Sequence, residues 1–303
     1  MPEAMITPKQ LRKFLAPYRI TDGKGLRLKD HGPHDTGGLA SQEKQKAKDL
    51  LARGVDWLAD AQGRLYADDR WSVLLIFQAM DAAGKDGTIK HVMSGVNPQG
   101  VQVVSFKAPS AEELDHDFMW RCLKVLPERG RIGIFNRSWY EEVLVVRVHE
   151  ALLARQRIPA ELVTRRIWAE RCEDIVNIER YLARNGCLIL KFFLNLSRGE
   201  QKKRFLERLD NPDKHWKFST ADARERGHWS AYMDAYESMI RRTATEHAPW
   251  YVVPADNKWF SRLVVAAAVV DALAGLDLRY PDVGPEKLKE LAEAKRMLQQ
   301  EED

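Results

Sequence analysis

The chain has 303 residues, of which 45% are hydrophobic and 30% charged, so it is long enough to bury a large core. Its 48 basic and 44 acidic residues leave a formal net charge of +4, so a site for a polyanion must come from local clusters of Lys and Arg. The three cysteines show no CxxC spacing, which argues against a disulfide framework or a zinc site and favours a reducing cytoplasm.

The N-terminal part, residues 1–70, is polar and helix-prone, and it is predicted to form a helical arm. Residues 1–14 contain no apolar h-region, so no signal peptide is predicted. Residues 22–38, DGKGLRLKDHGPHDTGG, have no periodic apolar face and are interpreted as a surface arm or long loop. Leucine and valine at helical spacing then predict a helix from about residue 41 to 62.

The predicted core, residues 71–276, alternates apolar runs with helical segments. The runs resemble parallel strands covered on both faces, and they occupy 71–80, 101–106, 132–135, 187–196 and 250–254. Helices are predicted over 110–126, 159–186 and 222–246. The most apolar run, 263–276, contains Asp271 and is too short for a membrane span, so it is interpreted as a buried helix. This order predicts an α/β fold with a parallel sheet flanked by helices, followed by an exposed C-terminal helix within 277–303.

The first core strand leads directly into QAMDAAGKDGTIKHV, with a helix expected from Lys85. Backbone N–H groups of such a loop, together with a helix N-terminus, can bind phosphate oxygens, and Lys85 can reach a transferable phosphoryl group. The standard phosphate loop has Gly where this chain has Ala79 and Ser or Thr where it has Asp86, so Asp81 and Asp86 are the local candidates for holding magnesium. The competing interpretation is an ordinary strand–turn–helix. The predicted phosphate-binding residues are Ala83, Gly84, Lys85, Asp86, Gly87, Thr88, Lys90 and Arg137.

A kinase with a phosphate loop also needs polar groups at the end of a neighbouring strand. Here the strand 132–135 is followed by Asn136, Arg137 and, after Trp139 and Tyr140, by Glu141 and Glu142. Asn136 offers only a neutral oxygen to a metal ion, so Glu141 or Glu142 would compensate. Arg137 could neutralise charge on the transferred group. The predicted metal ligands are Asp81, Asn136 and Glu141; for Trp139 and Tyr140 we favour packing. The histidines show no paired-ligand spacing, so no other metal site is predicted.

A basic segment follows the strand 187–196 and is predicted to form a mobile lid over about 198–225. Such density is typical of lids that close over phosphates, although a charge run on a helix is more often a solvated face. For Trp216, core packing is favoured over stacking on a base. The residues predicted to contact the nucleotide are Asn136, Glu141, Arg198, Lys202, Arg204, Arg208 and Lys214.

These three segments together resemble the polyphosphate kinase type 2 family: QAMDAAGKDGTIK, FNRSWYEEVLVVRVH and FFLNLSRGEQKKRFLERLDNPDKHWKFS. The resemblance extends from about Trp71 to Leu263. It implies a P-loop kinase fold with a helical lid, and Mg²⁺-dependent transfer of phosphoryl groups between inorganic polyphosphate and AMP or ADP, with GMP and GDP as further acceptors. Many members have Asp-Arg-Ser where this chain has Asn136-Arg137-Ser138, and the Asn form resembles the subgroup that uses both AMP and ADP.

The resulting hypothesis is a direct in-line transfer in which Asp81, Lys85 and Arg137 are catalytic. We expect Lys90, Lys107, Arg131 and Arg147 to extend a cationic track for the donor chain. We further expect a cytoplasmic homo-oligomer that binds neither nucleic acid nor membrane. One alternative is an ATP-dependent nucleoside or small-metabolite kinase on the same fold. The other is a basic P-loop module that binds nucleotide or nucleic acid without turnover; its weakness is the balanced net charge.

Overall fold

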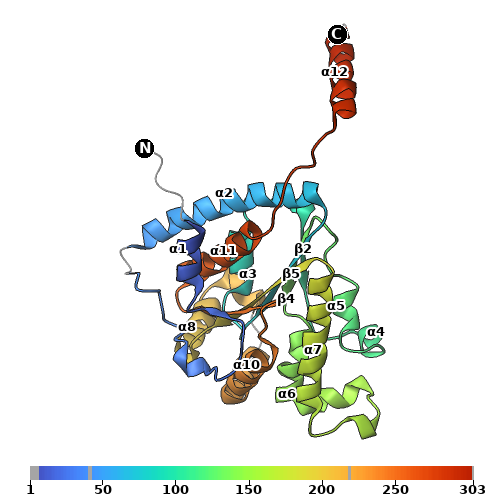
Figure 1. The fold of residues 1–303 in the computed structure, drawn as a ribbon. Coiled ribbons are helices and arrows are strands. Elements are labelled where there is room, and N and C mark those ends of the chain that lie inside the picture. The colour runs from blue at the N-terminus through green and yellow to red at the C-terminus, as the bar shows by residue number, and fades with distance from the viewer. Residues whose placement is uncertain (1–6, 40–42, 218–219, 302–303) are drawn as a thin grey trace.

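The computed structural model describes residues 7–39, 43–217 and 220–301, except for the side chains of residues 46, 47, 214 and 217. A six-stranded sheet with the order β1-β6-β5-β2-β4-β3 forms its centre (Figure 1). Strands β2 to β6 are mutually parallel, and only the short β1 runs antiparallel, beside β6. The strands are β1 (Arg19–Ile20), β2 (Ser72–Gln78), β3 (Val101–Ser105), β4 (Ile132–Asn136), β5 (Cys187–Asn195) and β6 (Trp250–Pro254).

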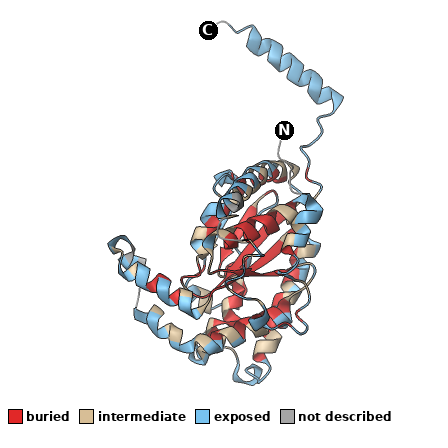
Figure 2. Cartoon of the chain, turned by 90° about the vertical axis from the view of Figure 1, so that its left-hand side faces the viewer, coloured by how far each residue is buried: buried red, intermediate tan, exposed pale blue. Residues whose placement is uncertain are grey.

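The central strand β2 is buried along its whole length because helices cover both faces of the sheet (Figure 2). Alternate side chains enter different cores: Phe77 packs in one hydrophobic cluster and Ile76 in the other. This two-sided burial explains why the strands read as continuous apolar runs. The α/β prediction and all five predicted strands are confirmed, with boundaries shifted by at most a few residues.

Helices α1, α2, α3 and α11 lie on one side of the sheet, while α5, α6, α7 and α10 lie on the other (Figure 1). The α-helices are α1 (Pro8–Leu15), α2 (Lys44–Asp68), α3 (Lys85–Val92), α4 (Ala111–Leu114), α5 (Trp120–Leu123), α6 (Val145–Val148), α7 (Ile167–Arg184), α8 (Arg198–Leu209), α9 (Thr220–Glu225), α10 (Trp229–Thr243), α11 (Lys258–Ala274) and α12 (Pro285–Gln299). The 3₁₀ segments are η1 (Leu28–Asp30), η3 (Pro98–Gly100), η4 (Trp139–Val143), η5 (Glu150–Gln156), η6 (Ala160–Leu162), η7 (Pro212–Lys217) and η8 (Arg226–His228). The buried helix expected over 263–276 is α11.

Three predicted helices are shorter or broken, and local side-chain bonds account for two of the differences. The helix expected over 110–126 is divided into α4 and α5, because Asp117 accepts the backbone N–H of Met119 and starts a new turn. The helix expected from 159 begins at α7 instead, after Thr164 accepts the N–H of Arg166. The helix expected over 222–246 is interrupted by η8, which contains Gly227. The helix expected from residue 41 starts outside the described residues at that end and extends to Asp68.

The N-terminal segment packs on the core rather than standing apart from it. Its strand β1, which the sequence analysis did not predict, pairs with β6. The stretch 22–38 consists of turns and η1, as the loop interpretation expected, but Leu26 and Leu28 are buried in the second hydrophobic cluster. Asn195, at the end of β5, donates to the carbonyl of His31 at 2.6 Å. The turns thus reach the carboxyl edge of the sheet.

Helix α12 stands away from the rest of the chain at the end of an extended segment (Figures 1 and 2). All its residues are exposed, as the sequence predicted for the C-terminal helix. In the part of the chain that the structure describes, no helix is long and apolar enough to cross a membrane.

Candidate active site

The loop between β2 and α3 curls at the carboxyl edge of the sheet. Ala82 has φ +65° and Gly84 has φ +101°, so the backbone passes twice through the left-handed region before the helix begins at Lys85. That region is easily accessible to Gly84 but strained for Ala82. The turn directs the first free N–H groups of α3 outward, which is the arrangement that binds phosphate oxygens.

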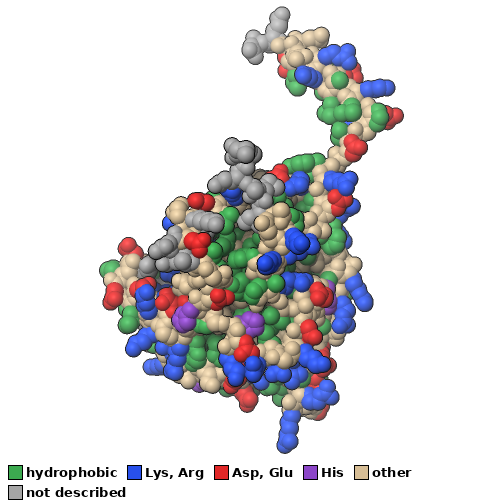
Figure 3. Space-filling view, turned by 60° about the vertical axis from the view of Figure 1, so that its left-hand side comes forward, with side chains coloured by type: hydrophobic (Ala, Val, Ile, Leu, Met, Phe, Trp, Pro, Cys, Tyr) green, Lys and Arg blue, Asp and Glu red, His purple; other side chains and the backbone are tan. Residues whose placement is uncertain are grey.

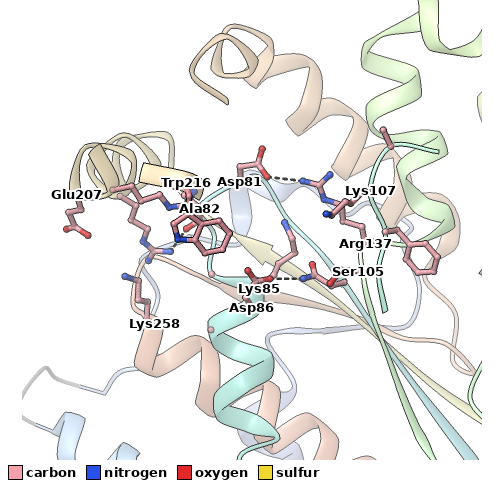
Figure 4. A pocket seen from close by; sticks show the side chains of 17 residues that line it. Asp81, Ala82, Lys85, Asp86, Ser105, Lys107, Arg137, Glu207, Trp216 and Lys258 are labelled. Atoms are coloured by element: carbon pink, nitrogen blue, oxygen red, sulfur yellow. Dashed lines mark hydrogen bonds and ion pairs between the residues drawn. The ribbon is translucent and has the colours of Figure 1, made fainter. Parts of the chain in front are cut away.

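Lys85 rises from this loop into a pocket of about 720 Å³ (Figure 4). Its Nζ donates to the carbonyl of Ala79 at 2.9 Å. Burial lowers the pKa of Lys85, while the nearby carboxylate of Asp81 acts in the opposite direction. The ammonium is therefore a poorly hydrated cation, and an anion bound beside it would compensate for the lost hydration.

Arg137, just past the end of β4, faces the phosphate loop. Its backbone has φ +68°, and its N–H donates to the carbonyl of Phe77 at 3.0 Å. The guanidinium forms an ion pair of 3.1 Å with Asp81, and both side chains remain 38% exposed. Burial acts to lower the pKa of Arg137, but the carboxylates of Glu141 and Asp81 outweigh it, so the pKa is raised. Strain at a half-buried, charged position is typical of a functional site.

The side chain of Asn136 is directed at the phosphate-loop helix. Its Nδ2 donates to Oδ1 of Asp86 at 2.7 Å, a contact marked by a dashed line in Figure 4. The amide thus orients one of the two carboxylates predicted to hold magnesium. Asp81 lies on the opposite side of Lys85 (Figure 4).

Glu141 and Glu142, adjacent in η4, have separate environments. Glu141 lies 2.8 Å from the side-chain amide of Gln78, and burial raises its pKa although Arg137 and Lys85 act to lower it. Glu142 instead forms a buried ion pair with Arg171 at 2.8 Å. Of the two acids that could compensate for Asn136, only Glu141 faces the phosphate loop.

Cations dominate the charged residues of the first pocket, which we call the donor pocket. Sequence analysis missed Lys258, which follows β6 at the same sheet edge, where the rule that ligands meet strand ends could have found it. Trp216 is 78% exposed and lines this pocket, so the prediction that it packs in the core is wrong (Figure 4). The lining residues are Asp81, Ala82, Gly84, Lys85, Asp86, Gly87, Ser105, Phe106, Lys107, Ala108, Asn136, Arg137, Arg204, Glu207, Arg208, Trp216 and Lys258.

Arg204 connects lid helix α8 to the phosphate loop. Its guanidinium donates to the carbonyls of Ala82 and Ala83 at 3.0 Å each, and to those of Ala255 and Asp256 at 2.7 and 2.9 Å. Its Nε donates to Glu200 at 2.8 Å, and the residue is 4% exposed. The geometry gives Arg204 a role in holding the loop, since its donors point to backbone rather than into the pocket.

Other predicted site residues lie outside the donor pocket. Lys202 and Arg198 are exposed on α8, and Lys90 is exposed on α3. Thr88 is buried beneath the loop, and the side chain of Lys214 lies outside the described residues. Ala83 contributes its carbonyl to the bond with Arg204.

A second pocket, which we call the acceptor pocket, has a volume of about 490 Å³ and shares the Asp81–Arg137 pair with the first. Its wall is mainly apolar and aromatic, and its charged residues are three acids and Arg137. Sequence analysis missed its far end, because His149, Glu225, Tyr232 and Tyr236 are separated along the chain and form no motif. The lining residues are Ala79, Met80, Asp81, Arg137, Glu141, Val145, His149, Ala151, Leu152, Glu225, Tyr232 and Tyr236.

The oxygens available near Lys85 fit a magnesium ion better than a metal caged by protein. Within the described residues there is no group of three or more His, Cys, Asp or Glu side chains arranged to hold a metal. Mg²⁺ commonly uses one or two carboxylates, with substrate phosphates and water completing the shell. Asp81 and Asp86, both on the donor-pocket wall, satisfy that requirement.

Comparison with known proteins agrees with this geometry. The family described as Polyphosphate kinase 2 (PPK2) matches residues 40–281. The ADP-polyphosphate phosphotransferase of Rhodopseudomonas palustris is 52% identical over 258 residues, covering 85% of this chain and 89% of the relative. The AMP/ADP-polyphosphate phosphotransferase of Meiothermus ruber is 45% identical over 264 residues, covering 87% of this chain and 94% of the relative.

A solved structure supports the same relationship. The crystal structure of polyphosphate kinase 2 from Arthrobacter aurescens superposes with a TM-score of 0.84 and 39% identity, over 97% of this chain and 99% of that one. With a fold, a sequence match and a phosphate loop that all agree, the chain belongs to the polyphosphate kinase 2 family.

Proposed function

We propose that this enzyme catalyses Mg²⁺-dependent transfer of a phosphoryl group between inorganic polyphosphate and nucleoside mono- and diphosphates, from AMP to ADP and from ADP to ATP. The observation that carries the proposal is that two pockets of different chemistry meet at the Asp81–Arg137 pair. GMP and GDP are further candidate acceptors; a relative from Pseudomonas aeruginosa named GDP-polyphosphate phosphotransferase is 33% identical over 261 residues.

The donor pocket suits a chain of phosphates. Its wall combines the N-terminal turn of α3 with five cationic side chains, those of Lys85, Lys107, Arg137, Arg208 and Lys258. Cations and free N–H groups bind phosphate oxygens and require no contact with a base or a sugar. The terminal phosphoryl group of polyphosphate would lie at the loop, near Lys85 and Arg137.

The acceptor pocket suits a nucleoside. Met80, Val145, Leu152 and two tyrosines provide the apolar and aromatic surface on which a base and ribose can pack. Its shared boundary with the donor pocket would place the acceptor phosphate opposite the terminal phosphoryl group. That arrangement supports the in-line geometry that phosphoryl transfer requires.

In the proposed reaction, an oxygen of the nucleotide phosphate attacks the terminal phosphorus of polyphosphate. The new P–O bond forms as the bond to the rest of the chain breaks, so polyphosphate leaves shortened by one phosphate. The attacking oxygen is ionised at neutral pH, so no strong general base is needed. Lys85 and Arg137 would stabilise the charge on the transferred group, and Asp81 would orient Arg137 through their ion pair.

Magnesium would be held by Asp81 and Asp86 with phosphate oxygens, and it would supply charge neutralisation at the transferred group. Asn136 and Glu141 were also predicted as metal ligands, and we propose that they support the magnesium site without contacting the ion. Asn136 orients Asp86, and Glu141 lies next to Gln78 on the acceptor side.

The proposal extends to a cytoplasmic location and a homo-oligomer. Cys122, Cys172 and Cys187 are free and buried, which fits a reducing cytoplasm. The exposed leucines of α12 fit a homo-oligomer in which another copy covers them.

The proposal is tested by incubating the protein with Mg²⁺, long-chain polyphosphate and either AMP or ADP, and separating the nucleotides by chromatography. We expect AMP to yield ADP and then ATP, and Lys85→Ala to reduce the rate by at least about 100-fold. Glu286→Gln, on the detached helix α12, is the matched surface control. Turnover with ATP as donor to a metabolite, and none with polyphosphate, would instead favour the ordinary kinase.

A further inference from the structure

The acceptor pocket has a polar far end that the transfer reaction itself does not use. Two tyrosines on α10, Tyr236 and Tyr232, line it four residues apart, which is about 6 Å along a helix. Tyr236 is buried and stacks on Phe193 with ring centroids 4.4 Å apart. Tyr232 donates its hydroxyl to Glu225 at 2.9 Å. Glu225 therefore marks one end of the pocket, and the Asp81–Arg137 pair marks the other.

Glu225 is held by two groups through the same oxygen. Its Oε2 contacts the hydroxyl of Tyr232 and Nε2 of His149, each at 2.9 Å. In the described part of the chain, Oε1 makes no hydrogen bond, and the side chain is 35% exposed where it lines the pocket. The carboxylate is thus fixed in position with one acceptor oxygen open to a ligand.

An ionised carboxylate can only accept hydrogen bonds, so its partner must be a donor. In a nucleotide whose phosphate meets Asp81 and Arg137, the ribose hydroxyls are the first donors beyond the phosphate. Carboxylates that accept hydrogen bonds from ribose hydroxyls are a recurrent way of recognising that sugar. The amino group of a base lies further from the phosphate than the ribose does.

We propose that Glu225 is a specificity-determining residue that accepts hydrogen bonds from the ribose hydroxyls of the acceptor and so selects ribonucleotides over deoxyribonucleotides. This inference rests on the proposed function, because it requires a nucleotide in the acceptor pocket. A deoxynucleotide would leave the carboxylate oxygen unpaired in a site closed by its ligand, which is the main source of discrimination by polar pockets.

The position of Glu225 adds a consequence for the lid. It is the last residue of α9, and the lid segment from α8 to α9 leads directly to it. Because Tyr232 already joins the end of α9 to α10, a ligand that contacts Glu225 would meet a lid end that is fixed before it binds.

The test compares kcat/KM for AMP, 2′-deoxy-AMP, 3′-deoxy-AMP and IMP with polyphosphate as donor, in the wild type, Glu225→Gln, Tyr232→Phe and Glu246→Gln. We expect the wild type to favour AMP over 2′-deoxy-AMP by roughly 10- to 100-fold. Glu225→Gln should bring that ratio to within about 3-fold by losing rate on AMP, and Tyr232→Phe should shift it in the same direction. Glu246→Gln, an exposed acid paired with Arg19 at 3.2 Å, should keep the wild-type ratio.

Equal use of AMP and 2′-deoxy-AMP by the wild type would overturn the inference. So would a Glu225→Gln variant that slows all nucleotides equally, or one that alters the AMP-to-IMP ratio alone, which would assign Glu225 to the base. If polyphosphate gives no product with any nucleotide, the proposed function fails separately. In that case, calorimetry would still test the role of Glu225. The dissociation constants of AMP and of the deoxy analogues would be compared in the wild type and in Glu225→Gln.

Discussion

At the scale of single residues, the hydrogen bond from Asn136 to Asp86 gives the amide a function as a donor. Many relatives are expected to have a carboxylate at this position. The hydrogen-bond length of 2.7 Å requires a donor on one side. Two carboxylates at that separation would repel, so one would retain a proton or both would need a cation between them. The amide removes this conflict because it donates to Asp86 and carries no charge of its own.

We therefore expect Asn136→Asp to introduce a new titration. The raised pKa of the carboxyl pair should make kcat/KM rise with pH between about pH 5.5 and 8, by at least about 3-fold beyond the wild type. The swapped double variant Asn136→Asp with Asp86→Asn keeps one acid and one amide, and should lose the extra pH dependence. Rates are measured with both AMP and ADP, because unchanged use of AMP by Asn136→Asp would count against an effect of Asn136 on acceptor choice.

Glu141 has a consequence for stability. Burial raises its pKa above the usual value of 4.5, so the folded protein binds this proton more tightly than the unfolded chain does. The stability from this group is present below pH 4.5 and is lost as the pH rises through the folded-state pKa. In Glu141→Gln, the melting temperature relative to the wild type should therefore increase with pH across this window. Thermal unfolding against pH checks the sign, and a difference that does not change with pH would contradict it.

At the scale of elements, a buried ion pair connects the segment after β4 to strand β5 and helix α7. Lys191 on β5 and Glu179 on α7 are fully buried and 2.6 Å apart. Tyr140, three residues after Arg137, donates to Glu179 at 2.7 Å and accepts from Lys191 at 3.0 Å. The network fixes η4, and with it the strand end that carries Asn136 and Arg137.

Replacing Lys191 with Met should leave Glu179 buried without its cation. We expect a loss of about 3–5 kcal/mol in the free energy of unfolding, measured by denaturant titration. The double variant Lys191→Met with Glu179→Leu removes both charges and should recover most of the loss. If the double variant instead lost as much free energy of unfolding as the two single variants together, the two groups would not act as a pair.

At the scale of the whole molecule, the catalytic body and α12 are separate in space. Figure 3 shows α12 projecting from the body with apolar side chains exposed among Lys, Arg and acidic ones. Its exposed apolar residues are Leu288, Leu291, Met297 and Leu298. The family match also ends at residue 281, before this helix begins.

Removal of residues 284–303 should leave the body folded and active. Because α12 buries nothing on its own chain, the melting temperature should change by less than about 2 °C and the rate on AMP by less than about 2-fold. Light scattering on the same samples would show whether the molecular mass falls, as the proposed homo-oligomer through α12 requires. A large loss of stability at unchanged mass would show that α12 packs on its own body.

The sequence by itself determined the parallel sheet and the phosphate loop, and it predicted that polar groups follow β4 at the neighbouring strand end. Short continuous apolar runs bounded by turn signals are typical of strands covered on both faces, and a loop such as 79–84 carries its geometry in adjacent residues. Lys85 and Arg137 could therefore be predicted, because each belongs to a motif within one segment.

Only the tertiary structure decided which side chains surround the reaction. Arg204 looked like a ligand-binding cation in the basic run, but packing directs its donors to the carbonyls of Ala82 and Ala83. Glu225 and His149 are 76 residues apart in the chain, and no local pattern indicates that they meet. Their pairing depends on how α6, α9 and α10 pack, which is a property of the assembled fold rather than of any segment.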